Sequence, residues 1–273
     1  MTRQASYAVE RCLAIIEMLA ASSEGLPLSS VAKNLDIPKS AVHRFLQVLE
    51  DRGYVGQDDS RRYRLTMRLV QIGFKFLAGR GVWEVAQPIL DRLAEHCGEL
   101  VRMTVADGDT LSWLGAAQGA KSGLIIDPVM GSPVVLHATA TGKIWLSSLP
   151  IDTAIGLVLR KGLGTPEEHG PGVIQSTEDL IRELKDTRAR GYGLAIEEAD
   201  PGVSAVAVGI PSSKGEDAPF VGTLSIAGPI YRLPRERLEG FVPELRAASG
   251  EIADMWSLIE NTPRASRERQ SFD

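Results

Sequence analysis

The stretch from residue 28 to residue 54, LSSVAKNLDIPKSAVHRFLQVLEDRGY, limits the fold of this chain more than any other. Its apolar residues recur at helical spacing on both sides of segment 36–38, where the helical period breaks. Ser29 or Ser30 can cap the first helix, and Pro38 suits the first turn of the second because no backbone N–H is needed there. The pattern predicts a helix-turn-helix, a motif whose second helix enters the major groove of DNA.

The second helix of this motif is predicted to be amphipathic. Its apolar positions lie on one side, and polar positions at i, i+1, i+4, i+5 and i+8 lie together on the other. This polar face consists of Lys39, Ser40, His43, Arg44 and Gln47. Because the face starts at the N-terminal end of the helix, we expect it to bind DNA, with Arg44 the best candidate for a bidentate contact to a base or phosphate.

Residues 54–65 follow the second helix and read as two short strands around an Asp/Ser turn. This pattern is typical of the β-hairpin wing that accompanies some helix-turn-helix motifs. We expect Arg61, Arg62 and Arg64, near the tip of the hairpin, to reach phosphates or an adjacent minor groove, with Arg61 and Arg62 the chosen DNA-binding candidates.

The charge of the chain is divided unevenly. The net charge is −5, which is not the charge expected of a DNA-binding protein as a whole. Residues 1–80, however, hold 12 Lys and Arg against 8 Asp and Glu, and residues 81–273 hold the remaining 18 against 27. A basic N-terminal module on an acidic body suits an anionic partner at one end only.

The rest of the chain is predicted to be α+β, with an antiparallel sheet flanked by helices. The turn at residues 107–109, Asp-Gly-Asp, is a strong hairpin signal. Predicted strands are 100–106, 110–116, 124–126, 203–210 and 220–227, and predicted helices are 82–97, 139–149, 151–160, 176–190 and 234–259. The expected domains are a DNA-binding domain (1–66), a linker helix (67–80), a small-molecule domain (81–260) and a flexible tail (261–273).

The sequence contains none of the common nucleotide-binding, hydrolase or zinc-protease motifs, so we expect no catalysis, no cofactor and no metal. No apolar run is long enough for a membrane span and the N-terminus does not resemble a signal peptide, so a cytoplasmic protein is expected. Two alternatives stay open. His137 and Glu197 could serve an enzyme with an accessory N-terminal module, or the helix-turn-helix could be a purely structural part of an interaction module.

Four segments together resemble the IclR family of bacterial transcriptional regulators, and the similarity extends over nearly the whole chain. They are LPLSSVAKNLDIPKSAVHRFLQVLEDRGYV, LHATATGKIWLSSLP, TRARGYGLAIEEADPGVSAVAVGI and VGTLSIAGP. The resemblance implies a winged helix-turn-helix, a linker helix and a GAF-like effector-binding domain. It also implies a homodimer, often a dimer of dimers, that binds operator DNA and senses a small carboxylic or aromatic metabolite. Such regulators control neighbouring catabolic operons, more often as repressors.

The resemblance also assigns site residues. It adds Ala41 to the recognition face and places Ala140, Thr141, Ala195 and Ala205 around the effector. Several family members have an acidic residue at position 195 and a cysteine at position 205, so the alanines predict a roomier and more apolar pocket. We therefore expect an effector larger or less polar than a two- or three-carbon acid. The remaining expected effector-binding residues are Trp113, Glu197 and Ser225.

Overall fold

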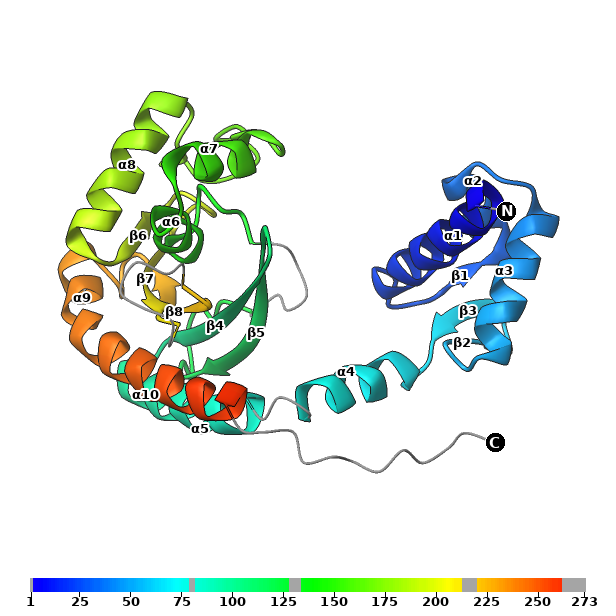
Figure 1. Cartoon of the computed structure of the whole chain (residues 1–273), viewed down its shortest axis with the longest axis horizontal. Coiled ribbons are helices and arrows are strands. Elements are labelled where there is room, and N and C mark those ends of the chain that lie inside the picture. The colour runs from blue at the N-terminus through cyan, green and yellow to red at the C-terminus, as the bar shows by residue number, and fades with distance from the viewer. Residues whose placement is uncertain (1, 79–81, 128–133, 213–219, 262–273) are drawn as a thin grey trace. The chain divides into compact units, whose positions relative to one another are not determined.

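The computed structural model describes residues 2–78, 82–127, 134–212 and 220–261. The chain divides into two compact units, residues 1–79 and 80–273 (Figure 1). The tail from residue 262 onward, predicted to be flexible, lies outside the described residues.

The N-terminal unit is a small helical module with a three-stranded sheet of order β1-β3-β2. Its core is formed by apolar side chains that recur at helical spacing along three helices and meet two residues of the sheet. The core residues are Ile15, Leu19, Val31, Ala32, Val42, Leu46, Leu49, Val55 and Tyr63. The elements are α1 (Thr2–Ala20), β1 (Leu26–Pro27), α2 (Leu28–Leu35), α3 (Lys39–Asp51), β2 (Val55–Gln57), β3 (Arg62–Leu65) and α4 (Arg68–Ala78).

The helix-turn-helix comprises α2 and α3, and the predicted winged motif is confirmed by these helices and the β2–β3 hairpin. One local expectation was wrong. Neither Ser29 nor Ser30 caps α2, because the helix already begins at Leu28, directly after Pro27. The turn is made by Asp36, whose left-handed backbone (φ 51°) ends α2 just before Pro38 precedes α3.

The second unit is built on a five-stranded antiparallel sheet of order β5-β4-β8-β7-β6, which confirms the predicted α+β class. Its strands are β4 (Leu100–Asp107), β5 (Thr110–Gln118), β6 (Gly193–Ile196), β7 (Val203–Ile210) and β8 (Gly222–Pro229). Its helices are α5 (Val82–Cys97), α6 (Ala140–Ser147), α7 (Ile151–Leu159), α8 (Thr177–Arg190), α9 (Arg235–Gly240) and α10 (Val242–Asn261).

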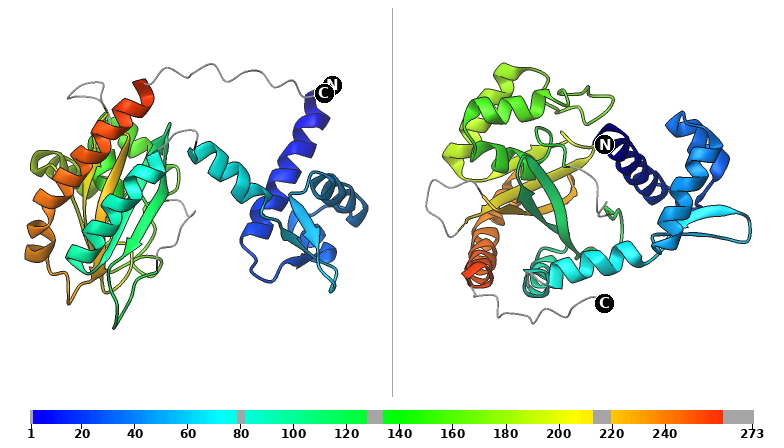
Figure 2. Two further views of the ribbon diagram at one scale, coloured as in Figure 1. Left: turned by 90° about the horizontal axis from the view of Figure 1, so that it is seen from below. Right: turned by 45° about the vertical axis from the view of Figure 1, so that its right-hand side comes forward.

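The two faces of this sheet carry different side chains. On one face, large apolar residues such as Met103 and Ile226 pack against α5 and α10, which lie side by side (Figures 1 and 2). On the opposite face α6 crosses the strands and packs against α8. Here the strands present small residues such as Ala195 and Ala207. Because side chains alternate across a strand, the small residues leave room under α6 that the large ones deny on the other face.

One sequence prediction about this unit is wrong, and one strand of the sheet was missed. Residues 124–126 form no strand, and Leu124 and Ile125 are exposed, so their apolar character does not mark a buried element. Strand β6 was not predicted, because its four residues are too few to show a clear alternation. Within the described residues, no helix has the length and apolar character needed to cross a membrane.

Candidate functional site

The polar face of α3 is exposed. Val42, Leu46 and Leu49 turn inward, which leaves the predicted recognition residues outside. Lys39, Ser40, His43, Arg44 and Gln47 are exposed, and Ala41 is half-buried. Gln47 donates to Asp51 of the same helix at 3.0 Å, while the described residues offer no partner to the side chains of Lys39, His43 and Arg44. These three side chains are therefore available to a molecule outside the protein.

The wing uses its arginines differently from what the sequence suggested. Arg61 lies exposed at the tip with a left-handed backbone (φ 58°). Arg62 instead turns inward, and its Nε and Nη2 donate to the Gly25 carbonyl at 3.2 and 2.8 Å. The guanidinium thereby ties the hairpin to the segment before β1. These bonds use Nε and Nη2 and leave Nη1 without a partner among the described residues, so a DNA contact of Arg62 stays a prediction.

Asp58 holds the hairpin turn closed. Its Oδ1 accepts the backbone N–H groups of Ser60 and Arg62 at 3.0 and 2.9 Å, and its Oδ2 accepts from Arg64 at 3.0 Å. The bond from the Arg62 backbone, helped by Arg64, lowers the pKa of this carboxyl below its ordinary value. Asp58 is thus a structural acid in the turn of the wing.

A cavity of about 180 Å³ lies in the second unit, under the start of α6. It is bounded by the N-terminal residues of α6, by small residues of β6, β7 and β8, and by two larger side chains of β4 and β5. The lining residues are Arg102, Trp113, Ile126, Asp127, Thr139, Ala140, Thr141, Ala195, Ala199, Asp200, Val203, Ser204, Ala205, Ser225 and Ala227.

The start of α6 is held firmly against the sheet. Thr139 caps the helix by accepting from the Gly142 N–H at 3.0 Å, and its hydroxyl donates to the Val135 carbonyl at 2.8 Å. Glycine is required at two contacts. A Cβ on Gly142 would collide with the backbone of Leu136, and one on Gly193 would collide with the Ala140 carbonyl. The first turn of α6 therefore forms a close-packed wall of the cavity.

The structure brings together most of the predicted effector-binding residues. Six of them line this one cavity: Trp113, Ala140, Thr141, Ala195, Ala205 and Ser225. Ala195 and Ala205 are direct cross-strand partners, so the two alanines together form the apolar side. Glu197 is placed elsewhere. Its Oε1 accepts from the Gly202 N–H at 2.9 Å and closes the turn between β6 and β7, so it does not line the cavity.

Arg102 is the main residue that sequence reasoning missed. It lies on β4, on the α6 face of the sheet, and its guanidinium carbon is 3.9 Å from the centroid of the Trp113 ring. A register shift between Met103 and Thr104 pairs Thr104 with Trp113 instead of Leu114. Trp113 is thereby turned to the cavity face, and Leu114 packs into the opposite core. No local pattern in the sequence predicts this β-bulge.

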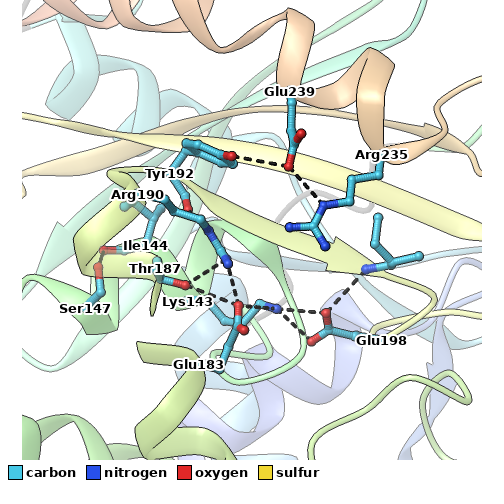
Figure 3. Close-up of polar contacts among 11 residues, drawn as sticks. Lys143, Ile144, Ser147, Glu183, Thr187, Arg190, Tyr192, Glu198, Arg235 and Glu239 are labelled. Carbon is cyan, nitrogen blue, oxygen red and sulfur yellow. Dashed lines mark hydrogen bonds and ion pairs between the residues drawn. The ribbon is translucent and has the colours of Figure 1, made fainter. Parts of the chain in front are cut away.

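A buried cluster of charged side chains joins α6, α8 and the turn after β6 (Figure 3). The Nζ of Lys143, whose side chain is only 2% exposed, lies 2.8 Å from Oε1 of Glu198 and 3.1 Å from Oε1 of Glu183. Glu183 also pairs with Arg190 at 2.7 Å. Lys143 lies on α6, Glu183 on α8 and Glu198 in the turn after β6, so one ammonium group joins three elements. Ala199 and Asp200, next to Glu198, line the cavity.

The two carboxylates of this cluster experience opposite net effects. Burial raises the pKa of Glu198 despite the attraction of Lys143. Burial acts in the same direction on Glu183, but Lys143 and Arg190 outweigh it and lower the pKa. Two bonds from Lys143 and one from the Ile196 N–H hold Glu198 in place.

The residues of the enzyme alternative do not meet at the cavity. His137 is buried outside it, where Nε2 donates to the Leu163 carbonyl at 2.6 Å and the ring packs edge-on against His169. Burial lowers the pKa of His137. Glu197 closes a turn, as described above. No cluster of three or more His, Cys, Asp or Glu side chains suited to a metal occurs in the part of the chain that the structure describes.

A winged helix-turn-helix followed by a separate α+β unit is the architecture of a transcriptional regulator. Comparison with protein families agrees. Residues 8–59 match the IclR helix-turn-helix domain, and residues 74–254 match the C-terminal domain of the bacterial transcriptional regulator IclR. The chain belongs to the IclR family of transcriptional regulators.

Individual relatives are similar over almost their whole length. The chain is 30% identical to the probable transcriptional regulator SauR of Cupriavidus necator, over 92% of this chain and 98% of that protein. It is 28% identical to the transcriptional repressor AllR of Escherichia coli K12, over 87% and 85% of the two chains.

Solved structures show the same fold. An IclR transcriptional regulator from Alicyclobacillus acidocaldarius superposes with a TM-score of 0.77 at 25% identity, over 92% of this chain and 98% of that one. An IclR homologue from Microbacterium hydrocarbonoxydans, complexed with 4-hydroxybenzoate, superposes with a TM-score of 0.77 at 20% identity. The match covers 92% of this chain and 99% of that one.

Proposed function

We propose that this protein is a ligand-responsive repressor of a catabolic operon, with α3 reading operator DNA and the cavity under α6 binding a small organic or aromatic acid. The observation that carries the proposal is the exposed face of Lys39, His43 and Arg44 at the start of α3, for which the described part of the chain supplies no partner. Cations at the N-terminal end of a recognition helix are suited to phosphates and to the base edges of the major groove.

The cavity supports an anionic effector. The first backbone N–H groups of an α-helix have no partner within the helix, and they carry a partial positive charge. Ala140 and Thr141, at the start of α6, both line the cavity. The opposite wall, with Ala195 and Ala205, is apolar and small, which suits the organic part of an acid and favours one larger than glyoxylate or pyruvate. The repressor AllR and the 4-hydroxybenzoate complex are compatible with this class of function.

The proposal includes a cytoplasmic homodimer that can assemble as a dimer of dimers on DNA. Apolar side chains of α1 and α4 are exposed in the single chain, which supports an interface there. They are Tyr7, Val9 and Leu13 on α1, and Val70 and Ile72 on α4. A two-fold dimer would read a pseudo-palindromic operator with half-sites about one helical turn, or a multiple of it, apart. Sedimentation of the full chain measures the oligomer directly, and a monomer at micromolar concentration would contradict this part.

The central test uses Arg44→Ala in a mobility-shift assay. The operator is a duplex selected by the wild-type protein from a random library. We expect the variant to lose specific binding, because a good bidentate base contact contributes about 1–3 kcal/mol of discrimination. Arg52→Ala, at the other end of α3, is the matched control and should bind like wild type. Intact operator binding by the Arg44 variant would remove this residue from the recognition face.

The same preparations distinguish the proposal from a purely structural helix-turn-helix. Binding through phosphates releases counterions, so the affinity should fall steeply as salt rises. Salt-insensitive binding, or no selection of any duplex by the wild-type protein, would refute the regulator function.

A further inference from the structure

Arg102 is a cation in the wall of the cavity that the described residues leave without a counter-ion in contact. Its Nε is fully buried and has no hydrogen-bond partner. Asp200, which also lines the cavity, acts on it electrostatically, but no ion pair joins the two. Burial lowers the pKa of Arg102 to about 10, so the side chain remains charged at neutral pH. The two Nη groups are not fully buried, so they are the donors of this side chain that a molecule in the cavity can reach.

The orientation of the guanidinium limits what can bind it. One face of this planar group lies over the Trp113 ring, 3.9 Å from its centroid. Donation from a guanidinium occurs in its plane, along its edges. Stacking therefore covers a face, and because Nε is fully buried, the two Nη groups at the end of the side chain are the donor pair that a bound molecule can reach. Two parallel N–H groups of this kind match the two oxygens of a carboxylate.

The neighbours of Arg102 keep space open beside it. Its cross-strand partners are Ala116 on β5 and Ser225 on β8, both small. The Ser225 hydroxyl donates to the Arg102 carbonyl at 3.3 Å and so lies beside the backbone of β4. Beyond Ser225 the next partner is Ala207, and Ala227 also lines the cavity. None of these cross-strand neighbours is acidic, so none of them can neutralise the guanidinium from within the sheet.

We propose that Arg102 determines effector specificity by binding the carboxylate of the effector end-on, through its two Nη groups, while Trp113 holds the guanidinium plane fixed. This inference rests on the proposed function, because it assigns a receptor to the acid that the cavity is thought to bind. The organic remainder of the acid then lies toward the apolar wall of Ala195 and Ala205. Uncharged analogues are rejected, because they leave the half-buried cation without a counter-ion.

The test compares acids with their amides on the full chain. The probes are benzoate, 4-hydroxybenzoate and pyruvate, with benzamide and 4-hydroxybenzamide as uncharged isosteres, each at millimolar concentration in thermal melts. At least one acid should raise the melting temperature of the wild type, and the amides should not. Arg102→Met should lose this stabilisation. Arg92→Met, which removes the same side chain from an exposed ion pair with Glu251, should keep it.

A readout without ligand separates a receptor from a structural residue. With no probe present, Arg102→Met should melt at the wild-type temperature or above, because it removes a half-buried cation that no described residue pairs with and keeps a side chain packed on Trp113. The inference is overturned if the variant melts several degrees lower without ligand, if it keeps the stabilisation by the acid, if amides stabilise as well as acids, or if no acid stabilises the wild type.

Operator binding by the same proteins distinguishes a failure of the proposed regulator function from a failure of the role proposed for Arg102. Arg102→Met should bind the selected duplex like wild type but should not be released by the acid that releases wild type. Failure of the wild type to bind any duplex would refute the regulator function. Normal operator binding together with normal release of the Arg102 variant would refute only the role of this arginine.

Discussion

Lys39 and Lys143 lie near the starts of two helices, one in each unit of the chain, and they are in opposite surroundings. Lys39 is exposed on α3, and no side-chain partner for it occurs among the described residues. Lys143 is buried on α6 between Glu183 and Glu198. An exposed cation without an internal partner is available to an anion from outside, whereas a buried and paired one holds its own domain together. The net charge of a unit does not reveal this difference.

The comparison extends to the arginines. Arg44 shares the surroundings of Lys39, and Arg190 those of Lys143. Arg62 is an intermediate case, since it lies in the DNA-binding unit but serves the architecture of the wing. Arg102 is a second exception, because it is largely enclosed in the second unit yet forms no ion pair with any described residue. Identifying function from charge therefore depends on which cations the fold leaves unpaired.

The largest expected effect is that of Lys143→Met. Removing one partner of a buried ion pair leaves the other charge uncompensated and costs about 3–5 kcal/mol. The loss should appear in urea unfolding followed by tryptophan fluorescence. All four tryptophans lie in residues 80–273, so this signal reports on the second unit alone. Adding Glu198→Gln to the Lys143 variant should recover part of the loss, because it removes an orphaned carboxylate.

The control for this experiment is Lys185→Met, since Lys185 is exposed on α8. Its free energy of unfolding should stay within about 0.5 kcal/mol of that of wild type, as for most surface substitutions. An equally small effect of Lys143→Met would show that the cluster does not stabilise the unit, and the contrast between the two lysines would fail.

Lys39→Ala tests the other half of the comparison and should have a moderate effect. If Lys39 contacts a phosphate, the variant should bind all duplexes more weakly and by similar factors, and the slope of log affinity against log salt should decrease by about 1. Filter binding at several salt concentrations measures both quantities. Lys161→Ala, an exposed lysine of the second unit, should leave the slope unchanged. A change of sequence preference without a change of slope would instead assign Lys39 to a base.

The smallest expected effect is that of Asp58→Asn in the wing. The pKa of Asp58 is lowered in the folded protein, first by its bond from the Arg62 backbone. A lowered carboxyl pKa contributes stability above the unfolded value of about 4, and this contribution disappears as the pH falls through the folded value. The variant should therefore show faster amide exchange at Ser60 and Arg62 near pH 7, with the difference shrinking toward pH 3.

Asp59→Asn is the control for the wing, because Asp59 is the exposed neighbour of Asp58. Amide exchange in this variant should match wild type at both pH values. A difference between Asp58→Asn and wild type that grew with acid would mean that the sign of the linkage is opposite to the one assigned here.

The sequence predicted those features that depend on local periodicity and turn chemistry. The helix pair around Pro38 and the hairpin at residues 107–109 follow from neighbouring residues, and both are present. The boundaries of α8 were predicted for the same reason. Ser176 caps its start by accepting from the Asp179 N–H, and Gly191 ends it in a left-handed conformation.

The features that the sequence did not predict depend on pairing between distant segments. Trp113 and Arg102 meet only because a bulge shifts the register of β4 and β5. Glu197 and Glu198 are adjacent and chemically alike, yet the first closes a turn and the second joins Lys143. The backbone of Glu197 is left-handed (φ 51°) at the start of this turn, and no periodic pattern in the sequence predicts this conformation or the different roles of the two carboxylates.

The close packing of Gly142 and Gly193 has a consequence for how such sensors diversify. Any side chain at either position would collide with backbone, so these two sites are closed to adaptive change whatever molecule is sensed. Substitutions that change ligand specificity should then occur on the strands, at cavity-lining positions such as 102, 195 and 205. There a side chain can be exchanged without moving the main chain. Descendants with a new chemical repertoire should thus keep both glycines and differ along the sheet.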